Sequence, residues 1–199
     1  MQPHVAGGAA SGLAATVDTQ LAAFRRNRFL TMPITGAIVW GGIGIAGATL
    51  PTRQAVLATY VGTGMIFYLA LLVSRILGED LLGRSRRGNL FDRIFLSTCA
   101  MSCLVYFIAI PFQLVEPGSV PLSVGILTGL MWLPFSAMLG HWVGYFHAIA
   151  RTVLLEAAWI AYPDHRFVAL PAVVVAVYLV SIVVLGRRWL AIHGSLRVR

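Results

Sequence analysis

Four side chains that can carry a charge or a proton lie in one apolar stretch, His141 to Trp159. They are His141, His147, Arg151 and Glu156. The stretch is long enough to cross a hydrocarbon core of about 30 Å, and an arginine near the middle of a bilayer costs roughly 2.5–3.5 kcal/mol on insertion scales. Ionisable side chains at such positions usually face a protein interior or a polar cavity. The sequence therefore places its candidate site in this segment.

The polar side chains of this stretch form two groups around a helix. At about 100° per residue, one group lies within about 60° of His141 and the other lies at about 240° and 280° from it. The arc opposite them is apolar and is expected to face lipid, so we expect the polar side of the helix to face other spans. The first group is His141, Tyr145, Thr152 and Glu156, the second is His147 and Arg151, and together they form the candidate substrate or ion pathway.

The spacing limits which of these groups can pair. Arg151 and Glu156 are about 140° apart around the helix, so an ion pair within it is unfavourable and their partners should come from other spans, a second subunit or a ligand. His147 and Arg151 share a face, which favours a neutral histidine by like-charge repulsion. A desolvated Glu156 would retain its proton near neutral pH and could exchange it.

The sequence indicates no metal and no cofactor. His141 and His147 are separated by about 120° around the helix, unlike the two histidines of an HExxH site. Cys99 and Cys103 share one helix face in an apolar segment and are interpreted as small buried hydrophobic residues. Neither a nucleophile elbow nor a phosphate-binding loop is present.

The composition is that of a membrane protein. Hydrophobic residues make up 58% of the 199 residues and charged residues 11%, against about 25% charged residues in a soluble domain. All fifteen basic residues are arginine, and they flank apolar segments instead of forming a stripe with interleaved aromatic residues. This placement is typical of contact with anionic lipid, so we expect membrane lipids as partners and no nucleic acid.

We predict an all-α transmembrane bundle of six spans. Residues 1–28 are expected to form an interfacial amphipathic helix, residues 29–185 the transmembrane domain, and residues 186–199 a basic cytoplasmic tail. Pro134 predicts a kink or an early end of the fourth span. The predicted spans are residues 29–50, 55–77, 94–114, 121–139, 141–162 and 167–185.

The arginines predict the orientation of the bundle. With both termini inside, two arginines, Arg53 and Arg166, lie in external turns, and Arg151 lies within a span. Such a bias toward one side favours a cytoplasmic location for both termini. The twelve cytoplasmic arginines would be Arg25, Arg26, Arg28, Arg75, Arg84, Arg86, Arg87, Arg93, Arg187, Arg188, Arg197 and Arg199.

A resemblance to a known family lies in three apolar stretches, PITGAIVWGGIGIAG, GTGMIFYLALLVSRILG and MWLPFSAMLGHWVGYFHAI. They resemble a family of small bacterial membrane proteins of unknown function. The resemblance covers roughly the first five predicted spans and implies a six-span protein of the bacterial inner membrane. It implies no activity, so no site is carried over from the family.

Three functions remain open from the sequence. The first is a small transporter or channel-like protein with optional proton coupling, in which Arg151 binds an anionic group or holds a gate, Glu156 carries a proton and the histidines complete the path. The second is an integral-membrane enzyme that uses Glu156 and His147 as acid and base on a lipid or isoprenoid-like substrate. The third is a non-catalytic sensor or assembly factor.

The expected partners follow from the thinness of a six-span bundle. We expect a homodimer, with the small-residue stripes of the first and fourth spans as candidate contacts. The expected ligand is a small molecule, an ion or a lipid, and its identity is open.

Overall fold

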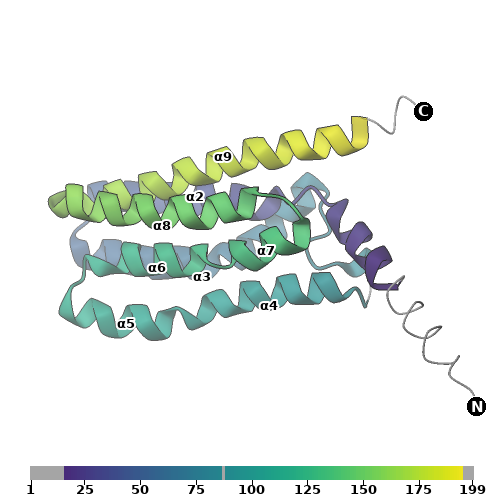
Figure 1. Cartoon of the computed structure of the whole chain (residues 1–199). Helices are drawn as coiled ribbons and strands as arrows, with labels where there is room; N and C mark the ends of the chain where they lie inside the picture. Colours follow the sequence, from purple (N-terminus) through teal and green to yellow (C-terminus); the bar gives the residue numbers. More distant parts are fainter. Residues whose placement is uncertain (1–15, 87, 195–199) are drawn as a thin grey trace, which may run out of the picture.

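The computed structural model describes residues 16–86 and 88–194, and the regular structure in those ranges is helical (Figure 1). The predicted all-α class is confirmed. Residues 16–25 form a first helix. It is followed by α2 (Thr31–Thr49), α3 (Thr52–Leu77), the 3₁₀ turn η1 (Arg84–Arg86), α4 (Leu90–Leu104), α5 (Tyr106–Val115), α6 (Ser119–Gly129), α7 (Trp132–Leu139), α8 (Val143–Ala161), the 3₁₀ turn η2 (Pro163–His165) and α9 (Arg166–Gly194).

Five helical segments are long and apolar enough to cross a membrane. They are residues 31–49, 52–77, 90–115, 119–139 and 163–193. Their length and composition make the chain a multi-pass helical membrane protein. α8 has 19 residues, as α2 does, but it is not among the five because of the polar side chains that it carries.

Two of these segments are each built from two helices. α4 passes into α5 at Val105, and α6 gives way to α7 at Leu130 and Met131. Pro134 accounts for the second break, because proline has no N–H to donate to the carbonyl of Leu130 and its ring clashes with that group. The predicted kink is therefore present, one turn before the proline itself.

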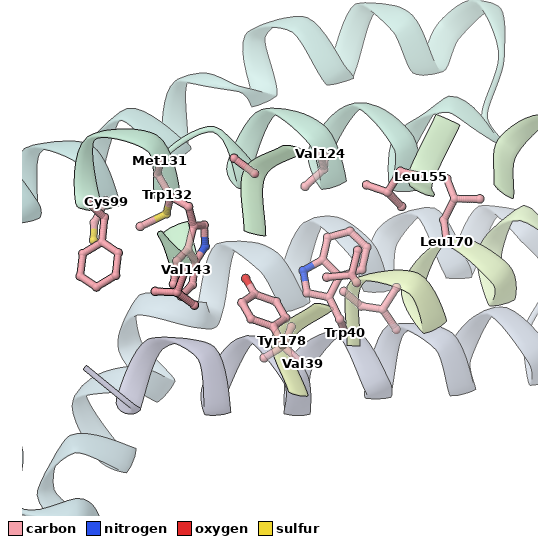
Figure 2. Packing of buried hydrophobic residues seen from close by; sticks show 14 of the residues in the cluster. Val39, Trp40, Cys99, Val124, Met131, Trp132, Val143, Leu155, Leu170 and Tyr178 are labelled. Carbon is pink, nitrogen blue, oxygen red and sulfur yellow. The ribbon is translucent and has the colours of Figure 1, made fainter. Parts of the chain in front are cut away.

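The long helices run side by side (Figure 1). α9 packs along α2 and α8, α6 packs along α8, and α4 with α5 lies on the outer side of α6 and α7. Both described ends of the chain lie at the same end of the bundle (Figure 1). The buried apolar core between these helices includes Trp40, Val124, Trp132, Leu155 and Tyr178 (Figure 2).

The glycines of α2 allow close contact with α9. A Cβ atom at Gly47 would lie 2.2 Å from the carbonyl oxygen of Phe167, and one at Gly36 would lie 2.4 Å from the ring of Tyr178. Only a residue without a side chain fits at such distances, as is common where membrane helices approach closely. Gly36 and Gly47 of the first small-residue stripe are therefore used within the chain.

The glycines of α6 are also used within the chain. A Cβ atom at Gly125 would lie 2.8 Å from Leu155, and one at Gly129 would lie 3.1 Å from Arg151, both on α8. Gly36, Gly47, Gly125 and Gly129 are thus covered inside one chain, whereas no atom of another described segment lies within 4 Å of a Cβ position at Gly41 or Gly42. The expected contacts of the two stripes between subunits stay predictions. The homodimer itself stays a prediction.

The two ends of the described chain differ from the expected segments. Phe24, in the predicted interfacial helix, is fully buried (0% exposed) and packs 4.7 Å from the ring of Phe29, so residues 16–25 are docked on the bundle. α9 continues to Gly194 through most of the expected tail. The remaining parts of both predicted segments, residues 1–15 and 195–199, lie outside the described residues.

Candidate functional site

Arg151 lies near the middle of α8, and its side chain is fully buried (0% exposed). Its Nη2 donates to Thr128 Oγ1 of α6 at 3.1 Å, and its Nη1 donates to the Tyr178 hydroxyl of α9 at 3.2 Å. Nη1 also lies 3.4 Å from Nε2 of His147. The rings of Trp40 and Tyr178 lie 5.4 and 5.3 Å from the guanidinium carbon. Arg151 thus connects α2, α6, α8 and α9.

The guanidinium of Arg151 contacts no carboxylate among residues 16–86 and 88–194. Its Nε atom is buried without a hydrogen-bond partner, and so is Nε1 of Trp40, whose ring flanks the guanidinium. A buried cation loses its hydration free energy. Hydrogen bonds to neutral groups and cation–π contacts compensate for that loss only in part. An anion at this place would stabilise the charge and could accept from the unused donors.

His147 is fully buried beside Arg151, and its protonation pattern follows from its neighbours. Ser181 Oγ donates to the carbonyl of Val177 at 2.9 Å, and it lies 2.9 Å from Nδ1 of His147. Because the hydroxyl proton is used, Nδ1 carries the proton and donates to Ser181, which leaves Nε2 as an acceptor for Arg151. The imidazole also stacks on the ring of Trp132, with centroids 4.0 Å apart and planes inclined by 15°.

The buried side of α8 centres on only one of the two predicted polar groups. The groups lie about 120–140° apart around the helix, and the neighbouring helices cover the side that holds His147 and Arg151. Tyr145 is 45% exposed, Glu156 is exposed and Thr152 is half-buried. The expectation that all the polar side chains of α8 face inward is therefore wrong for Tyr145 and Glu156.

His141 lies in the turn before α8, outside the cluster around Arg151. Its Nδ1 accepts from the backbone N–H of Val143 at 3.2 Å, and its carbonyl accepts from Ser136 Oγ. Burial and the Arg188 guanidinium lower the pKa of His141, which favours the neutral ring. The predicted pathway is thus divided among the buried pair, the turn at His141 and the exposed face of α8.

The partners of the buried pair were not found by sequence reasoning. Tyr178 and Ser181 come from α9, Thr128 from α6 and Trp40 from α2. One signal was present for α9, because Tyr178 and Ser181 are its polar side chains within the valine-rich run from Val173 to Val184. The other contributors are single residues in segments with no polar pattern.

The cysteines differ from each other in their surroundings. Cys99 is buried and Cys103 is exposed, and both are free thiols. The interpretation as buried hydrophobic residues therefore holds for Cys99 alone. Within the described part of the chain, His, Cys, Asp and Glu form no group of three or more that could hold a metal ion.

A family model covers most of the sequence. The model is described as a family of unknown function (DUF7010), and it matches residues 20–188. The chain belongs to the DUF7010 family. The matched part of this DUF7010 protein contains His147, Arg151 and all their partners. The expectation of a family of unknown function is thus confirmed, and membership in DUF7010 brings no assigned activity.

Comparisons with curated proteins and with solved structures returned no match to this DUF7010 chain.

Proposed function

We propose that this protein is a small transporter of the bacterial inner membrane that binds one small monocarboxylate at Arg151. The observation that carries the proposal is the buried guanidinium with an unused Nε donor and no carboxylate among its contacts in the described residues. The planar guanidinium matches a carboxylate, with which it forms short, charge-assisted hydrogen bonds. A single positive charge suits a monoanion better than a dianion.

The proposal includes six membrane spans, namely the five candidate segments and α8. α8 is as long as α2 and packs against α6, α7 and α9. Two groups of arginines lie at opposite ends of the bundle. Arg53 and Arg166 lie in the first turns of α3 and α9, at one end. The end at which both described chain ends lie is close to Arg25, Arg26, Arg28, Arg187 and Arg188. The proposed orientation places the end of the bundle that holds both described chain ends on the cytoplasmic side.

The proton of the proposed coupling is assigned to His147 instead of Glu156. His147 contacts Arg151 and is buried with it, whereas Glu156 is exposed on another face of α8. The same separation argues against an enzyme in which Glu156 and His147 act together as acid and base, because such a pair must reach one substrate.

The alternative favoured by a specific observation is a structural role for the buried pair. Arg151 contacts α2, α6 and α9 at once, so it also holds helices together. In that case the protein would be a non-catalytic sensor or assembly factor, and an anion would not be needed at Arg151.

Uptake by the purified protein in liposomes tests the proposal. We expect entry of radiolabelled lactate or pyruvate, little entry of succinate, and faster entry when the outside is acidic. Arg151→Gln should stop uptake while the protein stays folded, and His147→Gln should remove the effect of the pH gradient. Arg187→Gln, which removes an exposed arginine, is the control. Unchanged uptake by a folded Arg151→Gln protein, or no uptake of any monocarboxylate, would refute the proposal.

A further inference from the structure

A cavity of about 320 Å³ opens at the end of the bundle where α2 begins and α3 ends. Its volume is in the range of small-molecule sites. The apolar part of its wall includes Phe29, Met32, Phe95, Met131, Trp132 and Phe135. It is a different place from the Arg151 cluster, although Trp132 separates the two by lining the cavity and stacking on His147.

The aromatic wall of this cavity is held in a fixed arrangement. The ring of Phe29 lies 5.1 Å from that of Phe135 and 5.9 Å from that of Phe95. Phe29 has a φ of 58°, which a side-chain-bearing residue adopts at a cost in backbone energy. Such backbone positions cluster at ligand sites, where the surrounding structure holds them in place.

The carboxylates that line the cavity are already engaged within the chain. Glu79 accepts from the backbone N–H groups of Leu30 and Thr31, at 3.0 and 3.1 Å, and caps the start of α2. Asp80 accepts from the backbone N–H groups of Arg84 and Ser85, at 2.9 and 2.7 Å. Asp92 has a partner as well. These carboxylates already have partners within the chain, so they are not the groups that we expect to bind a ligand.

The arginines that line the cavity have donors to spare. Nε of Arg28 is buried without a hydrogen-bond partner, and its guanidinium carbon lies 4.5 Å above the ring of Trp189. Arg26 is exposed at the rim and has no hydrogen bond or ion pair within the described ranges. The unused polar capacity of this cavity is thus cationic, beside an apolar wall.

We propose that the cavity binds a small amphipathic anion, with one carboxylate at Arg28 and Arg26 and an apolar body against the aromatic wall. Charge-assisted hydrogen bonds hold the carboxylate, and burial of the body contributes about 25 cal/mol per Å² of apolar surface. This site goes beyond the proposed function, because it needs no transport and no contact with Arg151. A soluble aromatic acid and a fatty acid share this chemistry.

Direct binding of radiolabelled benzoate to the purified full-length protein tests the site. We expect saturable binding that Arg28→Gln weakens by about ten-fold or more, since a charged contact is lost. Arg187→Gln is the control, because Arg187 is an exposed arginine of α9 that does not line the cavity. This variant should bind benzoate as the wild type does. Met32→Trp should block the cavity, whereas Met32→Leu, which conserves volume, should not. Each variant is first checked for an unchanged unfolding temperature.

Competitors separate the sources of the ligand. Stronger displacement of benzoate by decanoate than by unlabelled benzoate would support the site and assign it to fatty acids, and weaker displacement would assign it to soluble aromatic acids. Displacement by benzylamine as strong as by benzoate would overturn the proposal, because it would show no preference for an anion. Folded wild-type protein that binds neither benzoate nor decanoate would overturn it too. Lactate uptake is measured separately, so failure of one proposal is distinguishable from failure of the other.

Discussion

The guanidinium of Arg151 is held by several neutral groups instead of one ion pair. Two hydroxyls, an imidazole and two aromatic rings surround it. The imidazole comes from its own helix, and the other groups come from α2, α6 and α9. Removal of the side chain therefore has two opposing effects on the free energy of unfolding. Contacts and packing are lost, but a costly buried charge is lost as well.

Substitutions of Arg151 separate these two effects. We expect Arg151→Ala to lower the free energy of unfolding by about 2–4 kcal/mol, because it leaves a cavity and takes a partner from Thr128 and Tyr178. Arg151→Gln retains much of the volume and can still donate to Thr128, so its loss should be smaller. Denaturant unfolding in detergent measures both, and equal losses would contradict the interpretation.

Ser181 is the residue that orients the imidazole of His147. We expect Ser181→Ala to lower the free energy of unfolding by about 1–3 kcal/mol, because Nδ1 of His147 would be buried without an acceptor. Ser123→Ala is the matched control, since the Ser123 hydroxyl also donates to the carbonyl four residues before it but contacts no histidine. A similar loss in both variants, measured by thermal unfolding, would show that the histidine contact contributes little.

Among the helices, the pairing of α2 with α9 depends on two close approaches. Gly36 and Gly47 bring α2 against the ring of Tyr178 and the backbone of Phe167. Because Tyr178 is also a partner of Arg151, the packing of α2 positions one wall of the candidate site. The glycines of α2 that do not touch α9 have no such role.

Alanine substitutions along α2 test this division. Gly47→Ala should lower the unfolding temperature markedly, because its Cβ atom would meet the Phe167 carbonyl and separate the two helices. Gly42→Ala should have no effect or a small stabilising one, since nothing lies within 4 Å of its Cβ position and alanine favours a helix by about 1 kcal/mol. Equal responses would mean that α2 moves freely against α9.

At the scale of the whole molecule, the proposed topology depends on α8. If α8 crosses the membrane, the turn before it and the turn after it lie on opposite sides. Trp142, which is 54% exposed, and Asp164 in η2 mark these two turns.

Labelling of intact cells with an impermeant maleimide tests the topology. In a protein with Cys99 and Cys103 replaced by alanine, we expect Asp164→Cys to react and Trp142→Cys to react only after permeabilisation. Reaction of both in intact cells, or of neither, would place the two turns on one side and remove α8 from the spans. Reaction of both after permeabilisation is the control for accessibility.

The sequence by itself determined the class of the protein and the chemistry at the centre of α8. The bilayer constrains the apolar length of each segment and the arginines beside it one segment at a time, so these features can be recognised in the sequence. The spacing of four residues places His147 and Arg151 on one face of any helix. Tertiary structure decided which face of α8 is buried and which residues meet Arg151. Periodicity gives the angle between side chains, but neighbours such as α6 and α9 choose the covered side. Thr128 reaches Arg151 where Gly125 and Gly129 let α6 pack closely on α8, and Tyr178 reaches it from α9, which packs along both α2 and α8.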